Sequence, residues 1–273
     1  MGIFDGVLIC TDLDGTLYKN DKTISEENRQ AIEYFKCEGG YFTFITGRLP
    51  YYSSDAYNVI MPNAPFGCIN GGGLYDGVEK KYICATKLSN DAVEFIECID
   101  GRFDNVGIQI CCFDKTYFVE ENEMTEQFRK RVGIPNLIRH YRDVKEPICK
   151  IIFNTDNSSV METIEKILRS HPISDKFEFI RSEKTLFEIL PKGVSKGDGL
   201  IKLSEYLGVE VNKTVAIGDF DNDVAMLKAA KLGIAVANAS KAALEAADIV
   251  TVSNEENAIA DVIYGLKSGK YHL

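Results

Sequence analysis

Short apolar runs alternate with a helical pattern at the beginning of the chain. Residues 6–11, GVLICT, form a continuous apolar run, which is typical of a strand buried on both faces of a parallel sheet. From Ser25 to Cys37 the apolar positions recur at helical spacing, and two glycines end the pattern. Apolar runs at 41–46 and 66–70 predict the second and third strands.

The same alternation returns near the end of the chain. It predicts, in sequence order, a helix at 196–207, a strand at 214–219, a helix at 222–230, a strand at 232–237, a helix at 240–246 and a strand at 248–252. Strands that alternate with helices are typical of βαβ units. We therefore expect an α/β core with a doubly wound parallel sheet.

The middle of the chain follows a different pattern. It combines predicted helices at 88–100, 123–131 and 158–170 with the strand-forming runs IQICCF, KTYFV, CKIIFN, FEFI and TLFEIL. Some of these runs come in hairpin-like pairs, which favours an antiparallel sheet of the α+β class. We expect the chain to divide into a first core part at residues 1–83, an inserted α+β domain at 84–190 and a second core part at 191–273.

Composition narrows the possible partners. The 273 residues carry a formal net charge of −10, and this acidity disfavours nucleic acids and anionic membrane surfaces as partners because both need clustered lysine and arginine. No apolar run approaches the length of a membrane span, and the first residues lack the features of a secretory signal. With eight cysteines and no CxxC pair, we expect reduced core cysteines in a cytoplasmic protein. The oligomeric state is not readable from these features.

The strongest chemical signal is the segment Asp12-Leu13-Asp14-Gly15-Thr16, directly after the first predicted strand. A period of two places both carboxylates on one side of the chain, at the strand end where open α/β sheets bind their ligands. A solvated turn is the structural alternative. Two carboxylates this close repel each other, however, so a cation or a shared proton has to compensate.

A second acidic group, Gly218-Asp219-Phe220-Asp221-Asn222-Asp223, follows the strand at 214–219. An EF-hand loop is excluded, because Val224 and Ala230 occupy the positions of its glycine and its bidentate glutamate. A helix N-cap explains one acid but not three within five residues. A site for a hard cation, shared with Asp12 and Asp14, explains the excess, and oxygen ligands of this kind suit Mg²⁺.

Two further elements suit a phosphate group. Thr46-Gly47-Arg48 ends the second strand, where a hydroxyl and backbone N–H groups can bind an anion. Lys196 lies between glycines at the start of a helix, although its spacing is not that of a P-loop. Each is weak alone: a turn with a solvated arginine and a surface lysine are the commoner explanations. Their common position at strand ends and helix starts of one sheet is the informative feature.

Together these segments resemble a known family. Asp-Leu-Asp-Gly-Thr, Thr46-Gly47-Arg48, Lys196 and Gly-Asp-x-x-Asn-Asp occur in the order of the four motifs of the haloacid dehalogenase superfamily. The chain is similar to the Cof-like, type IIB branch of sugar-phosphate phosphatases along almost its whole length, including the turn Ile69-Asn70-Gly71-Gly72. The long gap between Arg48 and Lys196 matches the α+β cap that this branch inserts after its third strand.

The resemblance implies a covalent reaction. Asp12 would attack phosphorus and form an aspartyl-phosphate. Asp14 would protonate the leaving alkoxide and then deprotonate the water that hydrolyses the intermediate. The Asp14 main-chain carbonyl and the carboxylates of Asp12 and Asp219 would bind Mg²⁺, the cofactor of the family.

The resemblance also implies how phosphate is held. Thr46, the Gly47 N–H, Lys196 and Asn222 would bind or support the phosphoryl group. Asp223 would support the lysine and the metal. Asp14 distinguishes the reaction class, because dehalogenases of the superfamily lack this second aspartate. Hydrolysis of a phosphate ester is therefore favoured.

Three functions stay open at this stage. The first is a Mg²⁺-dependent phosphatase acting on small phosphorylated metabolites. The second is a phosphomutase of the phosphomannomutase type, which would retain the phospho-enzyme to rephosphorylate a sugar. The third is a non-catalytic protein that binds phosphometabolites. The acidic surface favours small monophosphates over bulky polyanions as ligands.

Overall fold

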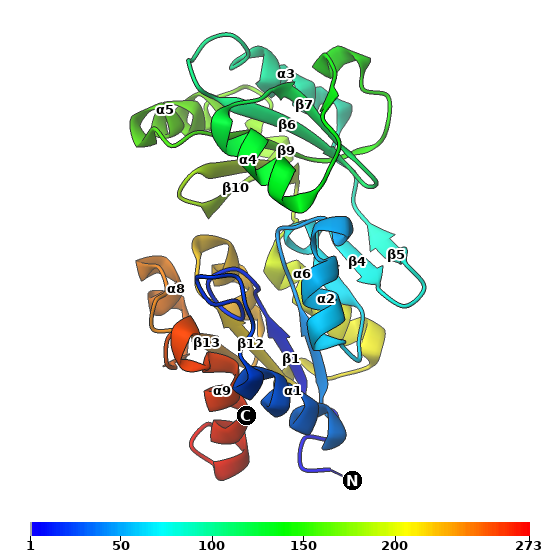
Figure 1. The fold of residues 1–273 in the computed structure, drawn as a ribbon, viewed down its shortest axis with the longest axis vertical. Coiled ribbons are helices and arrows are strands. Elements are labelled where there is room, and N and C mark those ends of the chain that lie inside the picture. The colour runs from blue at the N-terminus through cyan, green and yellow to red at the C-terminus, as the bar shows by residue number, and fades with distance from the viewer. Residues whose placement is uncertain (1) are drawn as a thin grey trace. The chain divides into compact units, whose positions relative to one another are not determined.

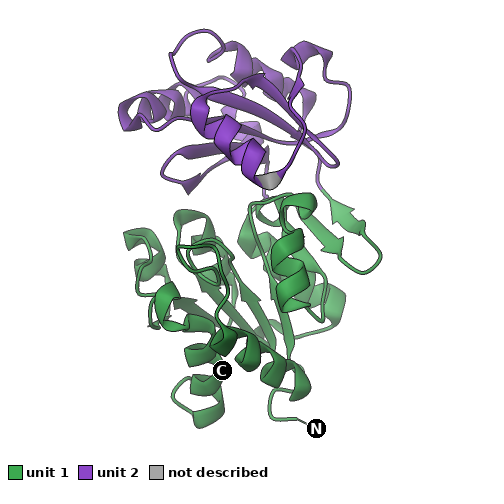
Figure 2. Ribbon diagram, viewed as in Figure 1, with its two compact units in different colours: residues 1–85, 195–273 green, residues 86–194 purple. Residues whose placement is uncertain are grey.

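The computed structural model describes residues 2–273, apart from the side chain of Val132. The chain forms two compact units (Figure 2). One unit combines the residues up to Ala85 with Ser195–Leu273, and the other is Thr86–Val194.

The first unit is built on a five-stranded sheet in which every strand pair is parallel (Figure 1). Its spatial order is β14 (Ile249–Val250), β13 (Leu232–Ala235), β12 (Thr214–Gly218), β1 (Leu8–Thr11) and β2 (Tyr41–Phe44). The interior strand β1 is completely buried, as expected for an apolar strand of a parallel sheet.

Within residues 2–85 and 195–273, six helices accompany the sheet: α1 (Glu26–Cys37), α2 (Ser54–Ile60), α6 (Lys196–Leu207), α7 (Val224–Ala229), α8 (Lys241–Ala246) and α9 (Ala258–Ser268). Ser25 caps α1, because its hydroxyl accepts the N–H of Asn28 at 3.1 Å. Helices α1 and α9 pack against each other. On the other side of β1, Leu8 and Cys10 belong to an apolar cluster with Leu203 of α6 and Met226 of α7.

A small antiparallel sheet extends the first unit. It comprises β3 (Phe66–Cys68), β4 (Gly73–Asp76) and β5 (Lys81–Ala85). The predicted strand at 66–70 is present as β3, but it pairs with β4 and is not a member of the five-stranded sheet. Only one isolated bridge, between Ile45 and Gly67, links it to the segment after β2, because the chain turns sharply at Ile69–Gly71.

The second unit contains a six-stranded sheet and three helices. Its strands, in spatial order, are β10 (Phe177–Glu183), β11 (Leu186–Pro191), β9 (Ile148–Asn154), β6 (Gly107–Cys112), β7 (Thr116–Glu120) and β8 (Leu137–Ile138). All pairs are antiparallel except β7 with β8. The helices are α3 (Val93–Glu97), α4 (Glu123–Val132) and α5 (Ser158–Arg169), and an apolar core joins α3 and α5 to one face of the sheet. The predicted fold class, a parallel α/β core with an inserted α+β unit, is confirmed.

Some predicted elements are shorter than expected. The helix at 88–100 is reduced to α3, preceded by a 3₁₀ turn at Asn90–Ala92, in keeping with the low helix propensity of its Asn, Asp, Val, Phe and Cys residues. Within the predicted strand at 248–252 only Ile249–Val250 is a regular strand, although the N–H groups of Asp248 and Thr251 also donate to the carbonyls of Gly233 and Ala235. Cys37 and Cys84 are exposed, so the expectation of core cysteines is wrong for these two. No helix among residues 2–273 is both long and apolar enough to cross a bilayer.

Candidate active site

The ends of three adjacent strands bring the predicted site residues to one edge of the parallel sheet. Asp12 follows β1, Asp219 follows β12, and Thr46 lies two residues after β2. Because β12, β1 and β2 are neighbouring parallel strands, their carboxyl ends meet at the same edge. The N–H of Asp12 continues the ladder by donating to the Ile217 carbonyl at 2.8 Å.

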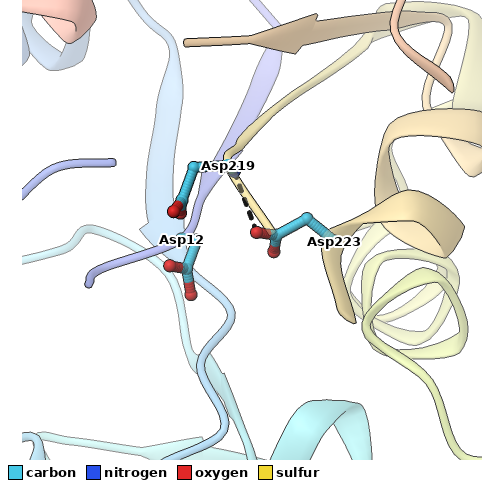
Figure 3. A group of neighbouring side chains, drawn as sticks. All are labelled: Asp12, Asp219 and Asp223. Carbon is cyan, nitrogen blue, oxygen red and sulfur yellow. Dashed lines mark hydrogen bonds between the residues drawn. The ribbon is translucent and has the colours of Figure 1, made fainter. Parts of the chain in front are cut away.

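Three carboxylates converge at this edge (Figure 3). Asp12, Asp219 and Asp223 each direct one oxygen into a group whose members lie within 4.8 Å of one another. Gly15, with a φ of +83°, borders the group, and a Cβ at this position would overlap the Asp219 carboxylate. The hydroxyl of Thr16 donates to Asp219 Oδ1 at 2.7 Å and fixes that side chain.

A buried lysine joins two of the carboxylates. Lys196 is the first residue of α6, and the hydroxyl of the capping residue Ser195 accepts the N–H of Asp198. The Lys196 ammonium donates to Asp12 Oδ1 at 2.5 Å and to Asp223 Oδ1 at 2.6 Å. Burial alone would lower the pKa of Lys196, but the two carboxylates outweigh it and raise that pKa. Lys196 therefore lies at the same edge of the sheet as the acidic group.

The acidic group needs more positive charge than Lys196 supplies. Burial raises the pKa of Asp12 well above its ordinary value, and the nearby carboxylates add to this effect against the pull of Lys196. Burial and the charge of Asp223 raise the pKa of Asp219 to about 7. A divalent cation would relieve both costs, and carboxylate oxygens are the ligands that Mg²⁺ prefers. The residues present therefore fit that ion.

Asp223 mainly braces the loop after β12. Its Oδ2 accepts the backbone N–H groups of Asp219 and Phe220, both at 3.0 Å, and Figure 3 shows the first of these bonds. Its Oδ1 accepts the bond from Lys196. Most of its acceptor capacity is thus used within the protein, so Asp12 and Asp219 are the better placed to bind a cation.

The carboxylate of Asp14 is held apart from the other three. Arg48 donates two hydrogen bonds to it, from Nε to Oδ2 at 2.8 Å and from a terminal nitrogen to Oδ1 at 2.6 Å. Lys22 adds a third bond to Oδ1 at 2.9 Å. Burial opposes ionisation of Asp14, but these two cations prevail and lower its pKa. Sequence reasoning treated Arg48 as a solvated turn residue and did not select Lys22.

The remaining predicted residues lie around the turn after β2. Thr46 is buried, and its hydroxyl accepts the N–H of Arg48 at 3.2 Å. The amide nitrogen of Asn222 donates to Oδ1 of Asn70 at 3.0 Å, and the same Asn70 amide lies close to Gly47. The structure thus brings Thr46, Gly47 and Asn222 together around Asn70, a residue that the sequence analysis did not select as a site residue.

Comparison with known proteins identifies the family. The family model of the haloacid dehalogenase-like hydrolases matches residues 9–263. A 5-amino-6-(5-phospho-D-ribitylamino)uracil phosphatase of Bacillus subtilis, YitU, is 30% identical over 261 residues, which cover 93% of this chain and 94% of the relative. A putative phosphatase of the same organism, YxeH, is 29% identical over 96% of this chain and 99% of its own length.

Solved structures agree with this assignment. A haloacid dehalogenase-like hydrolase from Bacteroides thetaiotaomicron superposes with a TM-score of 0.80 at 26% identity, over 94% of this chain and 98% of the other. The subclass IIB sugar phosphatase BT4131 shares the fold with a TM-score of 0.83, over 96% and 99% of the two chains, at 20% identity. The predictions of the family and of its phosphatase class are confirmed. The chain belongs to the haloacid dehalogenase-like hydrolases.

Proposed function

We propose that this phosphatase hydrolyses small phosphomonoesters with Mg²⁺ as cofactor and Asp12 as the nucleophile. The observation that carries the proposal is the buried Asp12 carboxylate, bonded to Lys196 and grouped with Asp219. A buried carboxylate with one cation beside it and further carboxylates around it destabilises the folded protein. Groups of this kind concentrate at catalytic sites, where their chemistry is needed.

The proposed reaction has two steps at one phosphorus atom. In the first, a carboxylate oxygen of Asp12 bonds to phosphorus while the ester P–O bond breaks. Arg48 and Lys22 keep Asp14 ionised in the free protein, so Asp14 has to take up a proton when the substrate binds before it can give that proton to the leaving alkoxide. In the second, Asp14 takes a proton from water as the water oxygen bonds to phosphorus. The acyl-phosphate bond then breaks, releasing inorganic phosphate and regenerating Asp12.

The chain's own groups hold the reacting atoms. Lys196 fixes one oxygen of Asp12 and brings a positive charge to the phosphoryl oxygens. The Thr46 hydroxyl, the Gly47 N–H and the Asn222 amide would bind or support the same oxygens. Bound through Asp12, Asp219 and the Asp14 carbonyl, Mg²⁺ would supply charge that neutralises the phosphoryl group.

The proposed substrate class follows from charge and from the relatives. A net charge of −10 disfavours bulky polyanions, so a small monophosphate ester is the better ligand. YitU and YwtE of Bacillus subtilis are both named phosphatases of 5-amino-6-(5-phospho-D-ribitylamino)uracil. That compound therefore belongs beside hexose and pentose phosphates among the substrates to test. We further propose that the inserted domain at 84–190 is the cap that selects the leaving group.

The test measures phosphate release from p-nitrophenyl phosphate, from hexose and pentose phosphates and from 5-amino-6-(5-phospho-D-ribitylamino)uracil. Each substrate is assayed with Mg²⁺ and with EDTA. Asp12→Asn should lower turnover by roughly a thousandfold or more, since it removes the nucleophile but keeps the shape of the side chain. Asp5→Asn, at an exposed aspartate of the same unit, is the matched control and should keep full activity. Equal turnover of Asp12→Asn and the wild type would refute the assigned nucleophile.

A further inference from the structure

The turn at Ile69–Gly71 has an unusual backbone. Three consecutive residues have positive φ: Ile69 at 57°, Asn70 at 52° and Gly71 at 86°. A β-branched residue such as isoleucine rarely adopts this conformation, because its side chain crowds the backbone. Strained backbone of this kind persists only where the surrounding structure fixes it, and it concentrates at functional sites.

The backbone of the turn fixes the segment after β2. The N–H of Asn70 donates to the carbonyl of Thr46 at 3.0 Å, and the N–H of Ile69 donates to the carbonyl of Arg48, also at 3.0 Å. These two bonds lie on either side of Gly47. The turn therefore fixes the backbone at 46–48. This segment carries the Thr46 hydroxyl and the Gly47 N–H, which are proposed to bind phosphate.

The side chain of Asn70 connects that segment to the loop after β12. Asn70 is completely buried, and its Oδ1 accepts the amide N–H of Asn222 at 3.0 Å. The same Oδ1 lies 3.1 Å from the position that a Cβ on Gly47 would take. Because an amide group is planar, this bond restricts the orientation of the Asn222 amide.

The last residue of the turn contacts the helix that carries Lys196. A Cβ on Gly71 would overlap the carbonyl oxygen of Ser195, the residue just before Lys196. From the other side, a Cβ on Gly199 would lie 2.8 Å from the Cα of Gly71. Only glycine permits this approach, so the start of α6 packs directly on the turn.

We propose that Asn70 is a positioning residue of the phosphoryl site, acting mainly through Asn222. Its turn contacts the three segments that carry the proposed phosphate-binding groups: the loop at 46–48, the start of α6 and the loop at 218–223. Asn70 does not itself react; it positions the Asn222 amide, to which it is hydrogen-bonded, and lies beside Gly47. This inference rests on the proposed function.

The experiment compares Asn70→Gly with Asn257→Gly. Glycine tolerates positive φ, so Asn70→Gly removes the amide without adding backbone strain. Asn257 also has positive φ, at 64°, but it lies at the start of α9, outside the candidate site. Its replacement by glycine makes the unfolded chain more flexible to the same extent, so it is the matched control. We would measure kcat and KM for p-nitrophenyl phosphate, and the Kd of inorganic phosphate by calorimetry, for both variants, for Asn222→Ala and for the double variant N70G/N222A.

Asn70→Gly should lower kcat/KM about tenfold or more and raise the phosphate Kd, while Asn257→Gly stays within about twofold of wild type. The double variant should be no worse than Asn222→Ala, because the two residues act together. Additive effects, or an Asn70→Gly variant that behaves like Asn257→Gly, would overturn the inference.

Two further outcomes are distinguishable. If the wild type binds phosphate but hydrolyses no ester, the proposed function fails, and the phosphate Kd of Asn70→Gly alone decides this inference. A wild type that binds no phosphate overturns both the proposed function and this inference.

If Asn70→Gly does not fold, Asn70→Asp replaces it. A carboxylate beside Gly47 and Asn222 should repel phosphate and raise its Kd, and an unchanged Kd overturns the inference.

Discussion

Replacing Asp219 by asparagine should stabilise the metal-free protein while abolishing its activity. Burial and the charge of Asp223 raise the pKa of Asp219 to about 7, so the carboxylate is ionised at pH 8 only at a cost to the folded state. Asparagine has nearly the same shape, and its oxygen can still accept the hydroxyl of Thr16. It removes the repulsion but also the charge that a cation requires.

The magnitude and its pH dependence follow from linkage. Raising a carboxyl pKa from 3.8 to about 7 corresponds to a ceiling of about 4 kcal/mol at a pH above both values. Between those two values the folded protein binds more protons than the unfolded chain, so the stability of the wild type falls as the pH rises. The advantage of Asp219→Asn should therefore grow by about 2–3 kcal/mol between pH 5 and pH 8.

The assay is urea denaturation of both proteins in EDTA at pH 5 and pH 8, with Asp5→Asn as the exposed control. Saturating Mg²⁺ should raise the stability of the wild type at pH 8 and leave that of Asp219→Asn almost unchanged. An Asp219→Asn variant that is no more stable than the wild type at pH 8, or whose advantage does not grow with pH, would refute this reasoning.

Two other predictions concern Arg48, which contacts the proposed acid–base residue Asp14, and Asp261, which has a structural role. Arg48→Ala should lower kcat about tenfold or more, because Asp14 loses the two hydrogen bonds that orient its carboxylate. Arg48→Lys should restore only part of the rate, since an ammonium group cannot make the bidentate contact of a guanidinium. Steady-state kinetics at saturating Mg²⁺ test this, and an unchanged kcat in Arg48→Ala would contradict it. Asp261→Ala should lower the free energy of unfolding by about 2 kcal/mol, because Lys270 and Tyr271 lose the carboxylate that accepts their hydrogen bonds. Urea denaturation measures the loss, and kcat/KM should not change; a stable variant with impaired catalysis would contradict the structural role.

The acidic residues of the site were predictable because their signal is local. Asp12 and Asp219 each follow a continuous apolar strand, and parallel strands gather their carboxyl ends at one edge. Lys196 was predictable only jointly with them, since a lone lysine at a helix start is usually exposed. The family's motif order supplied the remaining information.

The partners of these residues were not predictable from the pattern. Arg48 reads as a solvated residue after a turn, and its contact with Asp14 depends on how two loops meet, 34 positions apart in the sequence. Asn70 is distant in sequence from Asn222, and a positive φ leaves no mark on the hydrophobic pattern. For the same reason the pattern at 66–70 predicted a strand but not its partner: the sharp turn after β3 redirects the chain, and β3 pairs with β4 in a separate hairpin.

In the proposed mechanism the phosphoryl group is bonded covalently to Asp12 before it is released, and trapping that bond is the sharpest test of the mechanism. Asp14→Asn should keep the nucleophile but hydrolyse the intermediate slowly, so brief incubation with Mg²⁺ and p-nitrophenyl phosphate followed by acid quenching should load the protein. Mass spectrometry of the digest should then find one phosphoryl group on the peptide that contains Asp12, and none in the variant that also carries Asp12→Asn. Phosphate release by the wild type, with no phosphorylated Asp12 detectable in Asp14→Asn or in the wild type quenched during turnover, would contradict the account.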